Sequence, residues 1–142
     1  KEYTMAKVSG LGDTVSVDDS GGSARDISND ITDFSINLPQ NLLDVAGVDK
    51  SAQERLIGLS DGTVTLNGVF DPASNKAHDV FKTRTGTRTV TITLYEDGSG
   101  DPRLIMEMLV GNYDITRGND GMLTWTSTLS LQSGTVPTWS TS

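Results

Sequence analysis

Apolar and polar residues alternate along much of the chain, and the clearest example lies between Gly58 and Pro72. Here Val64 and Leu66 fall on one side of an extended segment, while polar residues fall on the other side. Such alternation predicts a β-strand with one buried face and one exposed face. Gly68 interrupts the apolar side, which indicates a bulge or the close approach of another backbone.

Five further stretches show a related pattern. They predict strands at residues 14–17, 34–38, 89–95, 104–110 and 123–131. The 104–110 stretch is apolar almost throughout, which suits a strand buried on both faces, and 123–131 is the longest strand expected. Turn-forming residues predict a hairpin that returns from 14–17 through 25–31, and a second hairpin at 118–121.

A single helix is expected between residues 73 and 84, where the apolar residues fall at helical spacing. Either Asp71 or Ser74 can cap its start. His78, the one histidine of the chain, lies beside the apolar stripe of this helix. It is interpreted as a residue at the surface or boundary of the helix.

The segment between the strand at 34–38 and the strand after Gly58 is harder to interpret. Residues 42–50 show no clean period and are predicted to form a long loop, a kind of segment that is commonly functional. Residues 51–57 fit two structures. Ser51 can cap a single helical turn, with Glu54 completing a capping box, or the segment can be a returning strand.

Composition narrows the class of protein. The 142 residues are expected to form one domain, with residues 1–12 as a flexible arm and residues 133–142 as a polar tail. The chain has no cysteine, so disulfides and thiolate metal sites are excluded. Its formal net charge of −8 argues against a protein that wraps nucleic acid, because that affinity depends on lysine and arginine.

The sequence contains no recognisable catalytic motif. Phosphate-binding glycine loops, nucleophile elbows and clustered metal ligands are all missing from it. The acidic loop at Asp18–Ser23 lacks the ligand spacing and the distal glutamate of an EF-hand. The chain is therefore interpreted as a protein without enzymatic activity and without a cofactor. Its exposed strand faces carry neutral hydroxyls in place of charges, which suggests assembly.

One run of residues also resembles a known family. Arg55–Pro72, followed by the helix around His78–Phe81 and the strand Thr89–Leu94, is similar to the tail tube protein of long-tailed, non-contractile bacteriophages. The resemblance extends to the N-terminal hairpin with Arg25–Ser28 and to the closing strand Leu123–Leu131. It covers most of the chain and implies a mainly β fold, an antiparallel sandwich or barrel with one flanking helix.

The resemblance further implies an assembly. Six copies would form a ring, and stacked rings would make the tube through which the genome is ejected into the host cell. Neighbouring subunits would continue one another's sheet into a closed barrel. A lumen without lysine or arginine would let DNA slide, because no phosphate would meet a cation that displaces its counterions. The candidate residues for lumen-facing or outward-facing polar rows are Thr63, Thr65, Asn67, Thr89, Thr91, Thr93, Thr124, Thr126 and Thr128.

Contacts between subunits are expected from other segments. The basic residues around the helix form either a solvated face or a surface that meets an acidic edge of a neighbour. Trp139 either packs on its own domain or, as we favour, anchors in a neighbouring subunit. The candidate inter-subunit contacts are Leu42, Leu43, Val45, Val48, Asp49, Lys50, Lys76, Lys82, Arg84, Arg88 and Trp139.

The resemblance also implies partners and a location. The partners would be the tape measure protein, the tail terminator and the distal tail proteins, and the location would be the virion tail after synthesis in the bacterial cytoplasm. No apolar run of the sequence is long enough for a membrane span. Two alternatives remain: a monomeric immunoglobulin-like adhesion or decoration module, and the inner tube of a contractile injection device.

Overall fold

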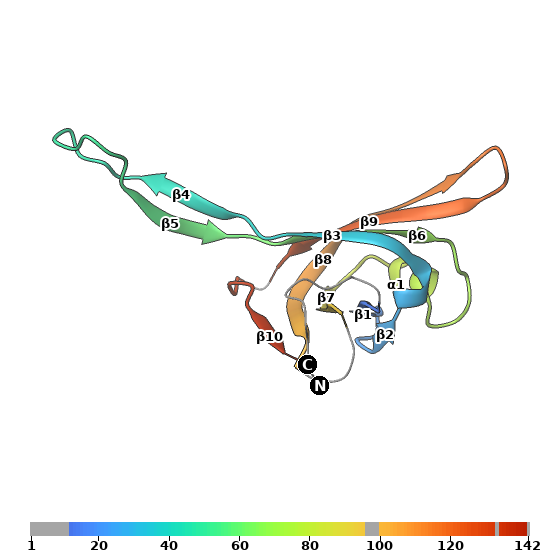
Figure 1. The fold of residues 1–142 in the computed structure, drawn as a ribbon. Helices are drawn as coiled ribbons and strands as arrows, with labels where there is room; N and C mark the ends of the chain where they lie inside the picture. Colours follow the sequence, from blue (N-terminus) through green and yellow to red (C-terminus); the bar gives the residue numbers. More distant parts are fainter. Residues whose placement is uncertain (1–11, 96–99, 133, 142) are drawn as a thin grey trace, which may run out of the picture.

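The computed structural model describes residues 12–95, 100–132 and 134–141. These ranges are mainly antiparallel β structure with a single α-helix (Figure 1). The N-terminal segment that is expected to be flexible, residues 1–12, therefore lies outside the described residues, except for Gly12. The elements are β1 (Thr14–Asp18), β2 (Ala24–Asp26), β3 (Ile31–Asn37), β4 (Gln40–Asp44), β5 (Arg55–Ser60), β6 (Thr63–Val69), α1 (Ala77–Phe81), β7 (Thr87–Thr93), β8 (Pro102–Arg117), β9 (Leu123–Leu131) and β10 (Trp139–Thr141).

One antiparallel sheet in the order β2-β1-β7-β8-β9-β6-β3 folds back on itself into two layers. β3, β6 and β9 form the upper layer in Figure 1, and β1, β2 and β7 form the lower one. The long strand β8 joins the layers: its first half pairs with β7 and its second half pairs with β9. A bulge between Val110 and Asn112 marks the change of partner.

The core lies between the two layers. β1 and β7 supply Val15, Val17, Val90 and Ile92 from below, and β6 and β9 supply Val64, Leu66, Trp125 and Leu129 from above. α1 adds Ala77, Val80 and Phe81, all fully buried. The ring of Phe81 lies 5.3 Å from that of Trp125 and 5.7 Å from that of Tyr113. The alternation of apolar and polar residues in the strands thus produces a single core that both layers share.

Gly68 has the close backbone neighbour that its position in the strand predicts. A Cβ at residue 68 would lie 1.9 Å from the carbonyl oxygen of Asp30 and 2.8 Å from Nε1 of Trp125. β3 bulges at this point, between Ile31 and Asp33, where it pairs with Gly68 and Asn67. Only a residue without a side chain fits beneath the bulge.

Two hairpins project from the body on opposite sides (Figure 1). We call β4, β5 and the turn between them, residues 40–60, the arm; it prolongs the β3–β6 pair beyond Pro39 and Gly62. The second projection, which we call the far hairpin, comprises residues 114–124 at the joined ends of β8 and β9. Residues 42–44 of the predicted loop belong to β4, whereas residues 45–50 lie in the connection between β4 and β5. Of the two structures that residues 51–57 fit, the returning strand is the one found at residues 55–57, which begin β5.

The helix is shorter than expected. It spans Ala77–Phe81, because Asn75 adopts a left-handed conformation with φ of 66° and interrupts the helical backbone. Lys76 is the N-cap residue and makes no side-chain cap bond, so the expected caps Asp71 and Ser74 are wrong. The carboxylate of Asp30 replaces them, since its Oδ2 accepts a hydrogen bond from the Ala77 amide at 3.0 Å.

β8 differs from its prediction in two ways. With sixteen residues it is the longest described strand, whereas β9 has nine. It is buried on one face only, because Leu104, Met106 and Met108 point into the core while Ile105 is 49% exposed. None of the helical segments in the described ranges has the length and apolarity that a bilayer crossing needs.

Candidate functional site: a polar sheet face without cations

The outer surface of the upper layer is a continuous polar face made by four strands. Residues directly opposite each other in antiparallel strands point to the same side of the sheet. One row runs from Asp33 through Asn67 and Thr126 to Asp114. The other members, read off the same pairings, are Ser35, Asn37, Thr63, Thr65, Val69, Leu109, Asn112, Thr116, Thr124, Thr128 and Ser130. We call this set the polar face.

Hydrogen bonds across the strands hold the side chains of the polar face. The amide Nδ2 of Asn67 donates to Oδ1 of Asp33 at 2.6 Å, and Thr126 Oγ1 donates to Oδ1 of Asn67 at 2.8 Å. On the other side of β9, Oδ1 of Asn112 accepts the backbone amide of Thr128 at 3.0 Å. These amides and hydroxyls are bound to each other, so the face is ordered before anything meets it.

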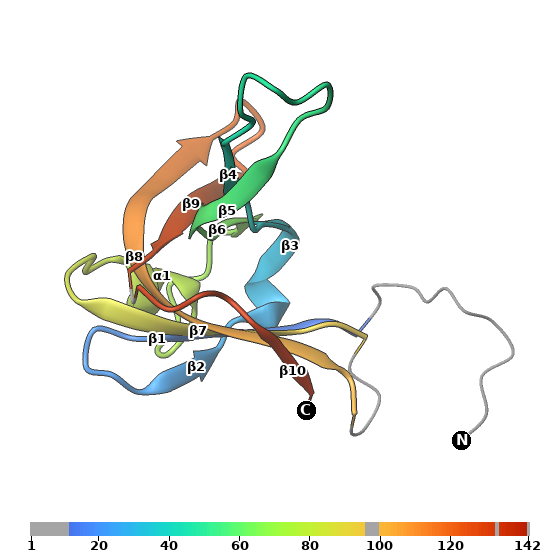
Figure 2. The same cartoon turned by 90° about the vertical axis from the view of Figure 1, so that its left-hand side faces the viewer.

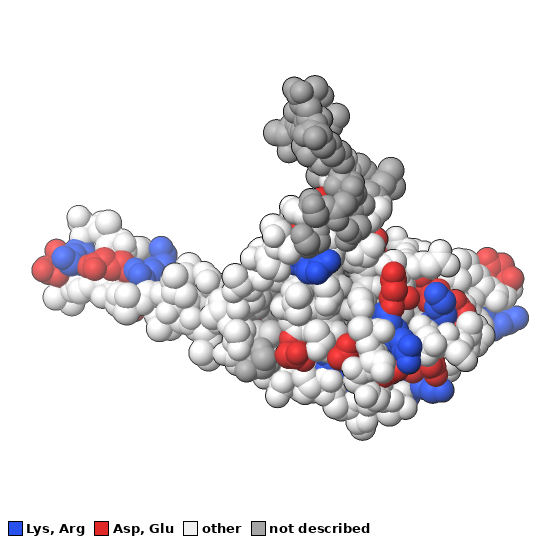
Figure 3. All heavy atoms as spheres, turned by 90° about the horizontal axis from the view of Figure 1, so that it is seen from below, with Lys and Arg blue, Asp and Glu red and all other residues white. Residues whose placement is uncertain are grey.

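The polar face carries two charged residues, Asp33 and Asp114, and its described positions include no lysine or arginine. Arg117, the nearest arginine along β8, pairs with Leu123 and therefore points to the opposite side of the sheet. The underside of the molecule is different, because acidic and basic residues are interspersed there (Figure 3). A surface with hydroxyls, amides and a few carboxylates offers nothing that displaces counterions from a phosphate backbone.

The structure brings together six of the nine residues predicted for polar rows. Thr63, Thr65, Asn67, Thr124, Thr126 and Thr128 all lie on the polar face. The other three lie on β7, in the lower layer. Thr89 and Thr91 point outward there, opposite Glu107 and Ile105. Thr93 is buried, with 1% of its surface exposed, so its predicted place on an exposed row is wrong. Its hydroxyl accepts a hydrogen bond from Nε of Arg103 at 3.2 Å.

Sequence reasoning missed the contributions of β3 and β8 to this face. Ser35 and Asn37 alternate with Phe34 and Ile36 in the predicted strand at 34–38, so the signal was present in the sequence. The β8 members were harder to find, because the bulge after Val110 shifts the alternation by one residue. The polar face is therefore wider than the sequence indicated.

The arm exposes apolar side chains on both of its surfaces. Leu42 lies opposite Ile57 on one surface, and Leu43 lies opposite Leu56 on the other. Ile57 is 67% exposed and Leu59 is 86% exposed. An isolated two-stranded hairpin is marginally stable in water, and clustered exposed apolar residues mark interaction sites. The arm therefore has the character of a contact surface.

The remaining predicted contacts on the arm lie toward its end. Val45 is paired through its backbone amide with the carbonyl of Glu54 at 2.9 Å, and Val48 is fully exposed. Nζ of Lys50 lies 3.6 Å from the carboxylate of Glu54. Asp49 is exposed in the same turn. Leu56, Ile57 and Leu59 join this set from β5 and were missed by the sequence analysis. For Leu56 and Ile57 the reason is that residues 51–57 fitted two structures.

The predicted basic cluster separates into surface and buried residues. Lys82 and Arg84 are exposed, and Nζ of Lys82 lies 2.8 Å from the carboxylate of Asp79. Lys76 is half-buried. Arg88 is only 1% exposed, so its predicted place in a surface cluster is wrong. A buried guanidinium cannot meet the edge of another subunit.

Arg88 ties the segment after α1 to β1. Its Nη1 donates to the carbonyl oxygens of Val80 at 2.7 Å and Asp18 at 3.0 Å. Its Nη2 and Nε donate to the carbonyls of Thr83 and Thr85. Burial lowers the pKa of the guanidinium, although Asp19 and Asp18 raise it. These contacts satisfy carbonyl groups that the end of a helix leaves without partners.

His78 contacts other side chains of this chain, and Trp139 lies in a strand that pairs with β8. Nδ1 of His78 lies 3.0 Å from the hydroxyl of Tyr113, and burial raises the pKa of that tyrosine. The His78 ring also lies 4.9 Å from that of Phe70. Trp139 belongs to β10, which pairs with the start of β8, opposite Leu104, and its side chain is 44% exposed. The tail therefore joins its own sheet and still presents part of the indole to solvent.

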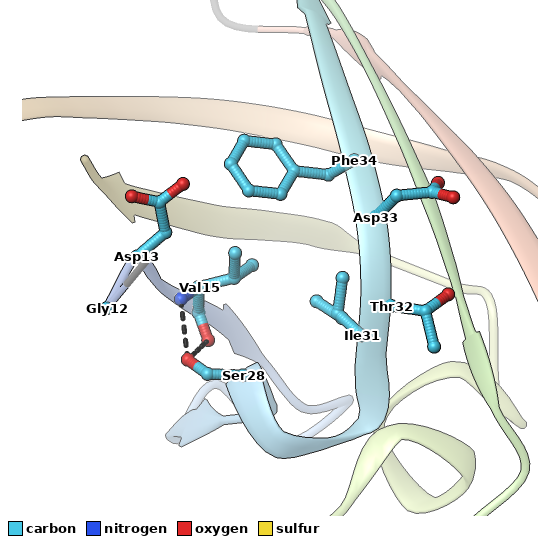
Figure 4. A pocket seen from close by; sticks show the side chains of 8 residues that line it. All are labelled: Gly12, Asp13, Val15, Ser28, Ile31, Thr32, Asp33 and Phe34. Carbon is cyan, nitrogen blue, oxygen red and sulfur yellow. Dashed lines mark hydrogen bonds between the residues drawn. The ribbon is translucent and has the colours of Figure 1, made fainter. Parts of the chain in front are cut away.

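Both margins of the four-stranded polar sheet are unpaired in the described residues. β3 pairs only with β6, and residues 110–117 of β8 pair only with β9. β3 and β8 lie at opposite margins of the sheet (Figure 2). A groove of about 400 Å³ follows the margin of β3, and Ile31 and Phe34 project into it toward β1 (Figure 4). The two layers are thus left open where the sheet ends.

The comparison with solved structures identifies the fold. No protein-family model matches the sequence, and no curated protein matches it. A chain in the tail of an empty gene transfer agent particle, computed with C6 symmetry, superposes with a TM-score of 0.72 at 13% sequence identity, covering 96% of this chain and 99% of that one.

A chain of the native gene transfer agent virion gives a TM-score of 0.66 at 12% identity, covering 90% of this chain and 95% of that one. Both chains are matched over nearly their whole length. The expected mainly β fold with one helix is confirmed. The chain has the fold of a phage-like tail protein.

Proposed function

We propose that the chain is a tail tube protein whose copies assemble into hexameric rings, and that the rings stack into a tube through which DNA leaves the particle. One observation carries the proposal: among the described residues, a four-stranded sheet has a polar face without cations and two unpaired margins. The similarity of the fold to a chain from a C6-symmetric tail supports the ring of six.

The directions of the two unpaired margins allow them to pair with each other. Along the sheet, β3, β6, β9 and β8 alternate in direction, so β3 and the second half of β8 run antiparallel. When copies stand side by side, β3 of one copy can pair with β8 of the next and continue an antiparallel sheet. Closing the ring leaves no exposed margin in the inner wall, which removes the usual hazard of edge-to-edge aggregation.

The polar face then lines the bore. Asp33 and Asp114 give it negative charge, and its hydroxyls and amides bond to one another. DNA would meet a wall that repels its phosphates weakly and binds none of them. The arm, with its exposed leucines, would reach the next ring, and Trp139 and the surface residues Lys82 and Arg84 would lie at contacts between subunits. The tape measure, tail terminator and distal tail proteins would be partners in the virion.

Electron microscopy of the purified protein and of the producing particle tests the proposal. Hollow tubes built from rings with six-fold symmetry are expected. A protein that stays monomeric at high concentration would instead indicate an adhesion or decoration module. A sheath around the tube in the particle would indicate a contractile device.

Lysine substitutions on the polar face should slow DNA without dissolving the tube. Thr65 and Thr128 lie opposite each other near its centre. With Thr65→Lys and Thr128→Lys in every copy, each ring gains a belt of cations that binds phosphates, so we expect ejection at least about tenfold slower and strongly salt-dependent. Thr91→Lys, on the outward side of β7, is the matched control and should leave the rate unchanged. Equal ejection rates for both variants would count against the lumen assignment.

Polar substitutions on the arm should weaken stacking without unfolding the subunit. Leu56 and Ile57 occupy opposite surfaces of the arm and contribute nothing to the core. The free energy of unfolding of the double variant Leu56→Ser with Ile57→Ser is expected to lie within about 0.5 kcal/mol of that of the parent chain. The protein concentration at which tubes appear should rise at least about tenfold, since apolar contact area is lost. Gln53→Ser on the same arm is the control, and sedimentation measures tube formation.

A further inference from the structure

Given the proposed ring, we propose a specific register for the contact between neighbouring copies: Asp114 of one copy lies opposite Asn37 of the next, about four residues from Asp33. This inference rests on the proposed function and adds the pairing that the ring requires. It concerns the margin of β3 and the second half of β8, whose outer edges have no partner strand within the described chain.

Repulsion between carboxylates disfavours a contact in which neighbouring copies meet without a shift in register. Within one copy, Asp33 and Asp114 end the same row of the polar face, one at each margin. If copies met without stagger, Asp114 of each would directly face Asp33 of its neighbour, and like charges directly opposed across strands are destabilising. A shift of four residues separates the two carboxylates by about 13 Å, beyond the screening length of about 8 Å at physiological salt.

Barrel geometry sets the size and sense of the shift. Strands in closed barrels tilt by about 35–45° from the axis. Across four strands about 4.8 Å apart, such a tilt displaces equivalent points along the strand by about 13–19 Å, which is about four to six residues, and four is the smallest shift in this range. Strand twist is right-handed. In the ring the polar face points inward, β3 and β8 form opposite margins of each copy, and the arm continues from one end of β3 (Figures 1 and 2). In this arrangement the right-handed twist shifts Asp114 of the neighbour along β3 toward the arm.

The shifted register also pairs the side chains well on both surfaces. On the polar side, the Asp114 carboxylate meets the amide of Asn37, and Thr116 meets Ser35. On the core side, Ile115, which is 45% exposed, meets the half-buried Ile36. Arg117 then lies opposite Phe34, beside the groove that contains the carboxylate of Asp13 (Figure 4). Asp114, Ile115 and Thr116 of the β8 margin thereby each gain a partner of matching chemistry.

Cysteine cross-linking tests this register, and the chain suits the method because it has no cysteine of its own. Asp114→Cys is combined in turn with Asn37→Cys, Ser35→Cys and Asp33→Cys, and assembled tubes are oxidised with diamide. β6 and β9 separate β3 from β8 within one copy, so the paired positions are at least about 14 Å apart there and cannot form a disulfide. Every disulfide between them therefore joins two copies.

We expect a covalent ladder that extends to six copies on a non-reducing gel, most intense for the Asn37 and Asp114 pair. A ladder most intense with Asp33 or Ser35 overturns the four-residue shift while leaving the tube intact. Tubes without cross-links in any pair overturn the contact between β3 and β8. If micrographs show no tubes for the parent chain, the proposed function itself fails. The single-cysteine variants control for folding and for random collision.

Discussion

Replacing Gly68 by alanine is expected to prevent the chain from folding. The new methyl group would lie 1.9 Å from the backbone oxygen of Asp30, a distance at which atoms overlap. Nε1 of Trp125 would lie 2.8 Å from the same methyl group, and it donates a hydrogen bond to the carbonyl of Val69 at 3.1 Å. Neither neighbour is a flexible side-chain end that could swing aside.

Asp30 cannot retreat without other losses. Its carboxylate accepts the amide of Ala77 at the start of α1, and its own amide donates to the carbonyl of Ile27 at 3.0 Å. Burial raises the pKa of its carboxyl, the bond from Ala77 lowers it, and the neighbouring Asp71 raises it. Moving residue 30 would therefore disturb the bulge in β3 and the helix together.

The loss for Gly68→Ala should exceed about 4 kcal/mol, a size reserved for severe core changes. Soluble yield and the denaturant midpoint of unfolding measure it. Gly21→Ala is the control: a Cβ there makes only an ordinary contact, 3.4 Å from Oδ1 of Asp19, and should change stability by less than about 0.5 kcal/mol. A Gly68→Ala protein that unfolds at the midpoint of the parent would refute the steric argument.

Replacing Arg88 by methionine should give the second largest effect. Methionine fills similar space, but it leaves the carbonyls of Val80 and Asp18 and those of two threonines without their donor. An unsatisfied buried polar group costs about 1–3 kcal/mol, so the unfolding free energy should fall by at least about 3 kcal/mol. For a chain of this length that corresponds to a fall in Tm of about 10 °C.

Two further variants isolate the cause. Arg84→Met removes an exposed positive charge from the same segment and should leave Tm nearly unchanged. Arg88→Lys keeps the charge but loses the planar fork that reaches several carbonyls, so its Tm should lie between those of the parent and Arg88→Met. Calorimetry of the unassembled protein distinguishes these outcomes. Equal losses for Arg84→Met and Arg88→Met would show that net charge is responsible, and not the buried contacts.

Much of the sheet was predictable because local pattern and burial agree in it. The alternation at Val64 and Leu66, and again at Val90 and Ile92, reports a strand with one buried face, and the structure has that arrangement. Gly68 was informative for a similar reason, because a glycine inside a strand implies a neighbour that no side chain can tolerate. These signals depend on neighbours along the chain or on one close contact.

The arm and Arg88 could not be predicted in this way. Leu42 and Leu43 are adjacent, and both are exposed, so the arm has no buried face to impose a period. Arg88 is charged and was assigned to the surface, whereas its partners are backbone carbonyls that become available only where α1 ends beside β1. Backbone acceptors leave no trace in the sequence.

The polar face could be predicted from the sequence only in part. Its β6 and β9 residues follow from alternation, but alternation does not say which strands share a surface. That assignment required the register, which places Asn67 between Asp33 and Thr126 and separates all three from Thr89 and Thr91 in the other layer.

The strand β8 has a mechanical consequence for a tube of such subunits. Its sixteen residues pass from the lower layer into the upper layer without a break in the backbone. A pull on the inner wall would therefore reach the outer layer through covalent bonds, and the two layers could not shear apart. Bending of the tube would therefore occur mainly at the contacts between rings, while each ring stays rigid.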